Sequence, residues 1–326
     1  MNNATAVVLL STGCPTGRKG VRPFIRGILG DPDVMRFPFS RAFSLLAAPI
    51  IARLRQKEVI RRYELIGGFG ILARKTGGIA EALERRLGVP VRAAYRYSPP
   101  SFDAVLDDLR RSGVERVAAI PLNPQFSIST NGAFLSAFVA SARRLGMGVS
   151  ALQSFYAHAA FEGIMVEHIR RFMETDGSDG PAGGDHVLFV AHSVPVRNLR
   201  LHDPYVGQVE AQMKTLAVRL GVEGRSSLAY QSSAGPIAWV GPAAEDHVRE
   251  LARSGVSSLL VVPLSFVVEN LETLYDLDVQ LRQVALDSGM KRYRRVPAPG
   301  EDGRFVDALA HVVLNGLKAV PAGPPA

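Results

Sequence analysis

Cysteine and long apolar runs are what this chain of 326 residues has least of. A single cysteine, Cys14, can form no internal disulfide and no four-thiolate cluster, so we expect a reducing compartment and no iron-sulfur centre held by the chain. No stretch approaches the roughly 18 uninterrupted apolar residues that a transmembrane helix needs. The first residues lack a basic region, and the apolar run at residues 6–10 is too short for a signal sequence. The sequence therefore predicts a cytoplasmic protein.

Acidic residues are in the minority, because 30 Asp and Glu stand against 38 Lys and Arg and leave a net charge of +8. The basic residues are scattered instead of grouped in runs, a pattern that argues against nucleic-acid binding. A basic surface suits an anionic small molecule and the anionic face of a membrane equally well. We expect no nucleic-acid partner and leave the other two open.

Short apolar segments rich in β-branched residues alternate with amphipathic segments, as is typical of βα units around a parallel sheet. The length of the chain favours two domains. The candidate strands are residues 6–10, 91–95, 116–120, 186–191, 227–230, 258–262 and 292–296. We therefore predict an α/β fold with two Rossmann-like domains, each a parallel sheet flanked by helices.

Two parts of the chain repeat each other in register. Residues 109–122 (LRRSGVERVAAIPL) and residues 251–264 (LARSGVSSLLVVPL) share a helix end, a glycine turn, a strand and a Pro-Leu pair. Upstream, VVLLSTGCP resembles VLFVAHSVP, which places Thr12 and His192 at equivalent strand ends. Such a repeat indicates an old duplication with pseudo-twofold symmetry, in which two similar domains face each other across a cleft.

The repeat divides the chain into two halves. We expect an N-terminal half over residues 1–155 and a C-terminal half over residues 156–301, with a helix at about 302–318 packing back on the first half. Residues 175–185 are rich in Gly, Asp and Ser and are predicted to be a linker or surface loop. Residues 319–326 are predicted to be a disordered tail.

Polar side chains follow several predicted strands, at the sheet edge where ligands of open α/β sheets bind. They are Thr12, Asn123, His192 and Ser265. Of the seven histidines, only His192 directly follows a strongly apolar strand and precedes a turn that contains proline. Histidine exchanges a proton near neutral pH and binds divalent metals, so His192 is a candidate catalytic residue. The alternative is a core histidine whose ring is fully hydrogen-bonded.

The acidic segment at residues 267–283 (VVENLETLYDLDVQLRQ) is the second candidate. The spacing of Glu269, Glu272 and Asp276 predicts a row of carboxylates on one face of a helix. Carboxylates with one histidine suit a borderline divalent metal such as Fe(II). Because the residues lack the spacing of a closed cage, we expect the metal to pass through and not to reside. A solvated acidic helix start is the alternative interpretation.

Two further segments have a less specific chemistry. The polar loop at residues 121–130 (PLNPQFSIST) follows a buried strand and is suited to binding an anionic group through hydroxyls and backbone N–H groups. The apolar segment at residues 37–55 is either a lip that touches a membrane surface or a buried core helix.

Together these segments resemble the ferrochelatase family, from about residue 7 to residue 317. The similar blocks, in the family's order, are VRPFIRGILGDPDVMRFP, IGG after Tyr63, RYSPP, PLNPQFSIST, AHSVP, DPY, YQSSAGP followed by Trp239, and ENLETLYDLD. The resemblance implies a chelatase-like fold and an enzyme that inserts Fe(II) into a porphyrin with release of two protons, at a terminal step of haem biosynthesis. The porphyrin would be protoporphyrin IX or coproporphyrin III.

The resemblance also assigns residues. It implies that His192 and Glu272 are catalytic and that, with Asp276, they form a transient path for the Fe(II) substrate, to which Glu269 is a further candidate. The residues expected to contact or frame the porphyrin are Arg55, Arg96, Tyr97, Ser127, Trp239, Thr12 and Asn123. Core packing remains the alternative for the aromatic residues among them, and a surface salt bridge for the arginines.

The chain departs from the family pattern at four places. Glu269 and Asn270 stand where many members have Asp-His, Asn123 where a Tyr follows the Pro-Leu pair, Gly70 and Ile71 where a Ser-Pro pair occurs, and Thr12 where members carry Met or Tyr. Two alternatives therefore stay open beside a ferrochelatase. They are another class II chelatase, which inserts cobalt or nickel, and a non-catalytic carrier of porphyrin or haem.

The resemblance implies no tightly bound cofactor, since ferrous iron and the porphyrin are substrates. Peripheral contact with the inner face of a membrane is compatible with it. So is transient contact with the preceding or following enzyme of the haem pathway.

Overall fold

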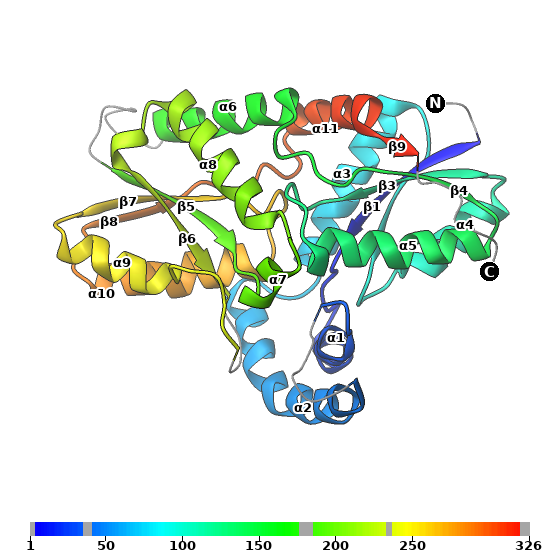
Figure 1. Ribbon diagram of the computed structural model, residues 1–326, viewed down its shortest axis with the longest axis horizontal. Helices are drawn as coiled ribbons and strands as arrows, with labels where there is room; N and C mark the ends of the chain where they lie inside the picture. Colours follow the sequence, from blue (N-terminus) through cyan, green and yellow to red (C-terminus); the bar gives the residue numbers. More distant parts are fainter. Residues whose placement is uncertain (1–3, 35–40, 176–184, 233–236, 320–326) are drawn as a thin grey trace. The chain divides into compact units, whose positions relative to one another are not determined.

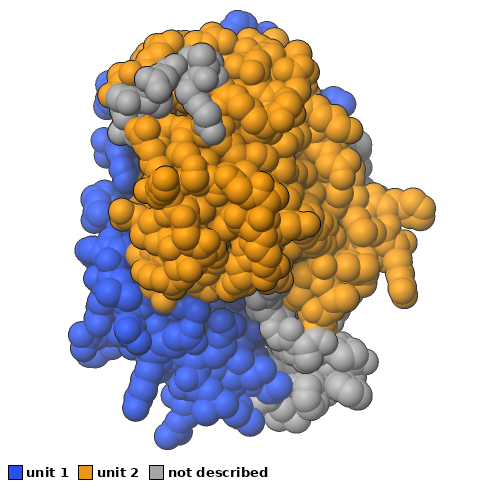
Figure 2. Space-filling view, turned by 90° about the vertical axis from the view of Figure 1, so that its left-hand side faces the viewer, with its two compact units in different colours: residues 1–155, 300–326 blue, residues 156–299 orange. Residues whose placement is uncertain are grey.

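The computed structural model describes residues 4–34, 41–175, 185–232 and 237–319 (Figure 1). The chain forms two compact units (Figure 2): unit 1 comprises residues 1–155 and 300–326, and unit 2 comprises residues 156–299. Most of the predicted linker and the predicted tail lie outside the described residues, as do residues 37–40 of the apolar segment. Among the helices of the described ranges, none is long and apolar enough to cross a membrane.

Unit 1 is built on a five-stranded sheet with the order β2-β1-β3-β4-β9. The first four strands are parallel, and β9 pairs antiparallel with β4. The elements of unit 1 are β1 (Thr5–Ser11), α1 (Arg18–Gly30), α2 (Arg41–Leu65), α3 (Ile71–Leu87), β2 (Val91–Tyr95), α4 (Phe102–Arg111), β3 (Arg116–Pro121), the short π-helix η1 (Ile128–Gly132), α5 (Ala133–Arg144), β4 (Gly148–Ala151), α11 (Gly303–Gly316) and β9 (Lys318–Ala319).

Unit 2 is built on a four-stranded parallel sheet with the order β6-β5-β7-β8. Its elements are α6 (Ala159–Thr175), β5 (His186–His192), α7 (Val196–Arg200), α8 (Tyr205–Leu220), the 3₁₀ turn η3 (Glu223–Arg225), β6 (Ser226–Gln231), α9 (Ala244–Arg253), β7 (Ser258–Pro263), the π-helix η4 (Glu272–Leu281), α10 (Arg282–Asp287) and β8 (Arg292–Arg295).

Helices cover both faces of each sheet because the central strands are apolar runs buried on both sides. In unit 1, α4 and α5 pack on one face, and α11 packs against α3, which contacts β2. In unit 2, α9, η4 and α10 pack on one face, while α6 and α8 pack together on the other (Figure 1).

The internal repeat is visible in the topology, since β2-β1-β3-β4 and β6-β5-β7-β8 follow one scheme. The helices α4 and α9 end alike: Ser112 and Ser254 have the same φ of −82° and ψ of 7°. Each is followed by a glycine in the left-handed region, Gly113 at φ 84° and Gly255 at φ 93°, where a side chain would be strained. The prediction of two similar Rossmann-like domains is confirmed.

Every predicted strand forms, but β4 and β9 were not predicted. β4 has the sequence GVSA, with one strongly apolar β-branched residue, and β9 has only two residues. Both lie at or next to the edge of the sheet, where pairing depends less on a long apolar run.

Candidate active site

His192 is the last residue of β5, and its ring orientation is fixed by its neighbour in the chain. The ring Nδ1 lies 2.6 Å from the carbonyl oxygen of Ser193. A carbonyl can only accept a hydrogen bond, so Nδ1 must carry the proton. In the neutral ring Nε2 therefore keeps its lone pair, which can accept a proton or bind a metal ion.

The backbone of His192 is held on both sides. Its N–H donates to Ser265 Oγ (3.2 Å), and its carbonyl accepts a hydrogen bond from the Tyr205 hydroxyl (2.8 Å). Tyr205 and Ser265 are themselves hydrogen-bonded (2.6 Å), and Phe266 packs against the imidazole at 6.3 Å between ring centroids. Burial raises the pKa of Tyr205, which keeps its hydroxyl a donor. The histidine is thus rigidly placed at the strand end.

Glu272 is the first residue of η4, which is a π-helix and not the α-helix that the spacing predicted. The N–H of Arg282 at its end donates to the carbonyl of Leu277, five residues earlier. Such wide turns are rare overall and are frequent at functional sites. Glu272 and Asp276 are four residues apart, a spacing that places two side chains on the same face of a helix. The helix therefore brings these two carboxylates together.

Glu272 interacts electrostatically with both His192 and Asp276. Burial raises the pKa of Glu272, the positive charge of protonated His192 lowers it, and the neighbouring carboxylate of Asp276 raises it further. Asp276 in turn accepts a hydrogen bond at Oδ2 from the Ser232 hydroxyl (2.8 Å). Unit 2 therefore holds Glu272 near one histidine and a second carboxylate, in surroundings whose burial favours the protonated form of Glu272.

Ser232 was not predicted as a site residue. It follows β6 with a φ of 67°, in the left-handed region that costs a non-glycine residue roughly 1–2 kcal/mol. Backbone strain of this kind persists where the surrounding structure enforces it, often at functional sites. The block YQSSAGP contains the residue but offers no signal for its conformation.

Glu269 does not join the carboxylate row, so that part of the prediction is wrong. The helical segment begins at Leu271, after Glu269. The Glu269 carboxylate is 8% exposed and accepts hydrogen bonds from Arg295 Nη1 (2.9 Å), the N–H of Ala298 (2.9 Å) and the Thr273 hydroxyl. The Glu269 carboxylate is thus the partner of an arginine.

Trp239 lies on a segment that pairs with the residues after His192. It forms an antiparallel bridge with Pro195, flanked by hydrogen bonds from Val196 N–H to Ala238 O (2.9 Å) and from Val240 N–H to Val194 O (3.0 Å). The half-buried indole is therefore anchored to the same strand end as the histidine.

In unit 1, Arg96 and Tyr97 share the carboxylate of Asp31. Arg96 Nε and the Tyr97 hydroxyl donate to Asp31 Oδ2 at 2.6 and 2.7 Å, and Arg96 Nη2 donates to Asp33 (3.1 Å). Although burial raises the pKa of Asp31, the hydrogen bonds from Arg96 and Tyr97 lower it overall. The N–H of Tyr97 donates to Thr12 O (3.2 Å), so these predicted residues lie together after β1 and β2.

The loop after β3 is organised by Asn131, a residue that was not predicted. Its fully buried amide donates to the carbonyls of Asn123 (3.0 Å), Gln125 (3.2 Å) and Gln153 (2.9 Å). The buried Ser127 hydroxyl accepts from the N–H of Ser129 (3.3 Å) and caps η1. Arg55 lies on the exposed side of α2.

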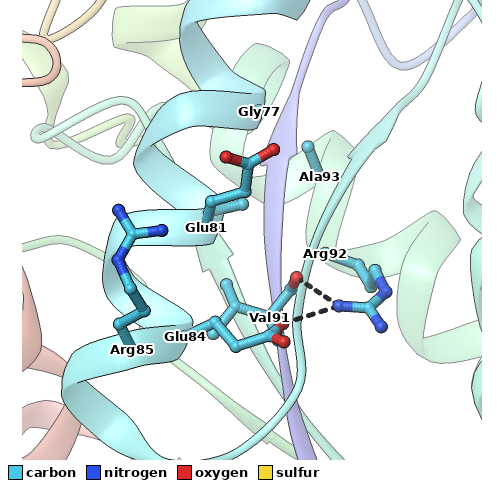
Figure 3. Close-up of a pocket in the computed structure, with 8 residues that line it drawn as sticks. Gly77, Glu81, Glu84, Arg85, Val91, Arg92 and Ala93 are labelled. Atoms are coloured by element: carbon cyan, nitrogen blue, oxygen red, sulfur yellow. Dashed lines mark hydrogen bonds and ion pairs between the residues drawn. The ribbon is translucent and has the colours of Figure 1, made fainter.

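A shallow groove of about 480 Å³ lies between α3 and β2, at the edge of the unit 1 sheet (Figure 3). One of the two carboxylates that line it, Glu84, accepts hydrogen bonds from Val91 N–H (2.8 Å) and Arg92 Nη1 (2.7 Å). The residues that line the groove include none of the predicted site residues. Over the described ranges, no three or more His, Cys, Asp or Glu side chains are grouped so that they could hold a metal ion.

Comparison with known proteins identifies the family of the chain. The family model of ferrochelatase matches residues 4–317. A ferrochelatase of Synechococcus sp. (strain JA-3-3Ab) is 35% identical over 99% of this chain and 96% of its own length. A ferrochelatase of Aquifex aeolicus (strain VF5) is 34% identical over 95% of this chain and 98% of its own length.

Among solved structures, SirB from Bacillus subtilis with Fe³⁺ is similar with a TM-score of 0.55 and 11% identity, over 96% of this chain and 95% of SirB. DR2241 from Deinococcus radiodurans has a TM-score of 0.53 and 14% identity, over 97% of this chain and 56% of DR2241. At such low identity these structures support the fold alone. Because the family model and these relatives match it over nearly its whole length, the chain belongs to the ferrochelatase family and is a porphyrin metal chelatase.

Proposed function

We propose that this enzyme inserts Fe(II) into a porphyrin with Nε2 of His192 as the acceptor of the pyrrole protons. The porphyrin must lose two N–H protons while one Fe²⁺ binds its four nitrogens, so charge is conserved. The hydrogen bond from Nδ1 to the Ser193 carbonyl carries this proposal, because it leaves Nε2 as the basic nitrogen of the neutral ring. A ring held from both sides of its backbone has little freedom to turn away.

We further propose that Glu272 and Asp276 carry protons away from His192 and draw Fe(II) inward. A carboxylate whose pKa is raised by burial exchanges protons more readily near neutral pH, and the interaction with His192 links the two groups directly. Hard carboxylate oxygens beside an imidazole suit ferrous iron as a passing substrate.

The porphyrin would be bound through the remaining predicted residues. The half-buried indole of Trp239 offers a face to the macrocycle, and hydroxyl, amide and cationic groups offer partners to its carboxylates. These groups are Thr12, Asn123 and Arg55. Arg96, Tyr97 and Ser127 would frame the binding site instead, because their polar atoms are already bonded within unit 1. Binding energy from the periphery would help to bend the ring, which aims the nitrogen lone pairs at the incoming metal ion.

A peripheral contact between α2 and an anionic membrane is proposed from the exposed residues of that helix. Ile50 and Leu54 are 63% and 75% exposed. Arg53, Arg55 and Lys57 are exposed beside them. Apolar side chains flanked by cations are typical of helices that lie on anionic lipid surfaces.

His192→Ala should reduce anaerobic Fe(II) insertion by about 10²–10⁴-fold, because it removes a positioned proton acceptor. Insertion can be followed by porphyrin absorbance, and porphyrin binding by quenching of the porphyrin fluorescence should persist. Wild-type turnover in this variant would refute the assignment of His192.

Glu272→Gln should nearly abolish insertion and yet make the protein more stable, because it removes a buried carboxylate. A carboxyl whose pKa is raised by folding loses stabilisation as the pH rises above its ordinary value of 4.5. The stability advantage of the variant in denaturant unfolding should therefore widen from acidic to neutral pH. An advantage that is constant or reversed over this range would contradict the burial of an ionisable Glu272.

Ser232→Ala and Ser232→Gly should both slow insertion several-fold, since both remove the hydrogen bond to Asp276. The glycine variant should be more stable than the alanine variant by roughly 1–2 kcal/mol, because glycine relieves the positive φ. Insertion rates of the two variants measure the role of the hydroxyl, and their denaturant unfolding measures the cost of the positive φ. An alanine variant that turns over like the wild type would show that the hydroxyl is not needed.

Leu54→Glu should lower co-sedimentation with vesicles that contain phosphatidylserine, because it places a negative charge on the proposed contact. Leu314→Glu is the matched control, since Leu314 is 59% exposed on α11 of the same unit. Equal binding by both variants, or no binding by the wild type, would rule out the contact through α2.

A further inference from the structure

Arg295 is the last residue of β8 and binds two carboxylates of the segment around η4. One precedes Glu272 in the chain and the other follows Asp276. Its guanidinium is 7% exposed. Nε and Nη2 donate to the two oxygens of Asp278, each at 2.7 Å, in a bidentate pair. Nη1 donates to Glu269 Oε1 at 2.9 Å. One side chain thus ties a residue before the helix to a residue in its second half.

The segment between these two anchors carries Glu272 and Asp276. Glu269 is fixed further by the N–H of Ala298 and the hydroxyl of Thr273. The start of the helix is also closed, because Asn270 Oδ1 accepts from Thr273 N–H (2.9 Å) and Thr273 Oγ1 accepts from Asn270 N–H (3.0 Å). The reciprocal pair resembles a capping box.

Tyr293, two residues before Arg295, adds a third anchor. Its hydroxyl donates to the carbonyl of Leu277 at 2.7 Å. This carbonyl also accepts the backbone N–H of Arg282 in the π-helix itself. Burial raises the pKa of Tyr293, so the hydroxyl remains a donor. Residues two apart on a strand share a face, which places Tyr293 and Arg295 on the side of β8 that η4 covers.

Arg294 lies between them and points to the opposite side of the strand. It is as buried as its neighbour, at 7% exposure, and pairs with the buried carboxylate of Asp185, which precedes β5. The strand therefore presents two equally buried arginine–carboxylate pairs, only one of which involves the π-helix.

A π-helix of ten residues is long for a conformation that usually persists for one turn. Side-chain contacts from outside must favour it over an α-helix, in which each residue is rotated further about the axis. Relaxation to an α-helix would turn Glu272 about the helix axis relative to Leu277 and Asp278, the two residues of η4 that β8 holds. The anchors on β8 oppose this relaxation at both ends of the segment.

We propose that Arg295 is a positioning residue for metal insertion, which holds η4 in its wide form through Glu269 and Asp278 and so fixes the positions of Glu272 and Asp276 within unit 2. The inference rests on the proposed role of these two carboxylates. It also gives Glu269 a function, as a counter-ion of the Arg295 guanidinium.

The test compares Arg295→Met with Arg294→Met. Each variant removes one buried guanidinium, so both should lower the midpoint of thermal unfolding by similar amounts. Only Arg295→Met should lower kcat for Fe(II) insertion, by about 10- to 100-fold, the effect usual for residues that orient metal-binding groups. The KM for porphyrin should be unchanged. Arg295→Lys should recover little, because an amine cannot form the bidentate pair.

An equal loss of kcat in both methionine variants would overturn the proposed role of Arg295, and so would an unchanged kcat in Arg295→Met. In either case Fe(II) insertion by the wild type would still support the proposed function. If Arg295→Met fails to fold, Glu269→Gln takes its place, since it keeps the volume and loses the charge. That variant should lower kcat several-fold, and wild-type kcat in it overturns the proposal. If the wild type inserts no Fe(II), the proposed function is wrong, and so is the role of Arg295 that rests on it.

Discussion

The hydrogen bond between Nδ1 of His192 and the Ser193 carbonyl is the interaction on which the chemistry of this site depends. It decides which imidazole nitrogen is protonated, and so which one is available to a substrate. The fold supplies the conditions for it. A strand buried on both sides ends at His192, and Tyr205 and Ser265 fix the backbone on either side of the ring.

Two glutamates three residues apart show how local structure sets the role of one residue type. Glu269 precedes the helical turns and meets Arg295, so its buried charge is compensated. Glu272 is the first residue of the π-helix, where its charge is opposed by burial and by Asp276 and is stabilised by protonated His192 and by a hydrogen bond from its own backbone N–H. The first is suited to holding structure, and the second to exchanging protons.

The fold and the central residues could be read from the sequence because they depend on strong, local signals. Apolar β-branched runs mark the central strands, the repeated helix–glycine–strand–Pro-Leu segment marks the two equivalent units, and His192 stands where such a strand ends. The spacing of Glu272 and Asp276 also pointed to neighbouring side chains, although for a helix of the wrong pitch.

The other features of the site depend on contacts between segments that are distant in the chain, and sequence patterns do not reveal such contacts. Nothing in ENLETLYDLD distinguishes a π-helix from an α-helix, because the choice rests on anchors from β8. The pairing of Glu269 with Arg295 could not be predicted because the two residues are 26 positions apart. Ser232 was missed because a left-handed serine carries no signature, and Asn131 because its three backbone partners are spread over the loop and the end of β4.

The tautomer of His192 can be measured directly by ¹⁵N-resolved NMR of protein labelled at histidine, near neutral pH, with the signals of His192 identified by their loss in the alanine variant. We expect a protonated Nδ1 and an unprotonated Nε2. A neutral ring protonated at Nε2 would contradict the assignment of that nitrogen as the proton acceptor.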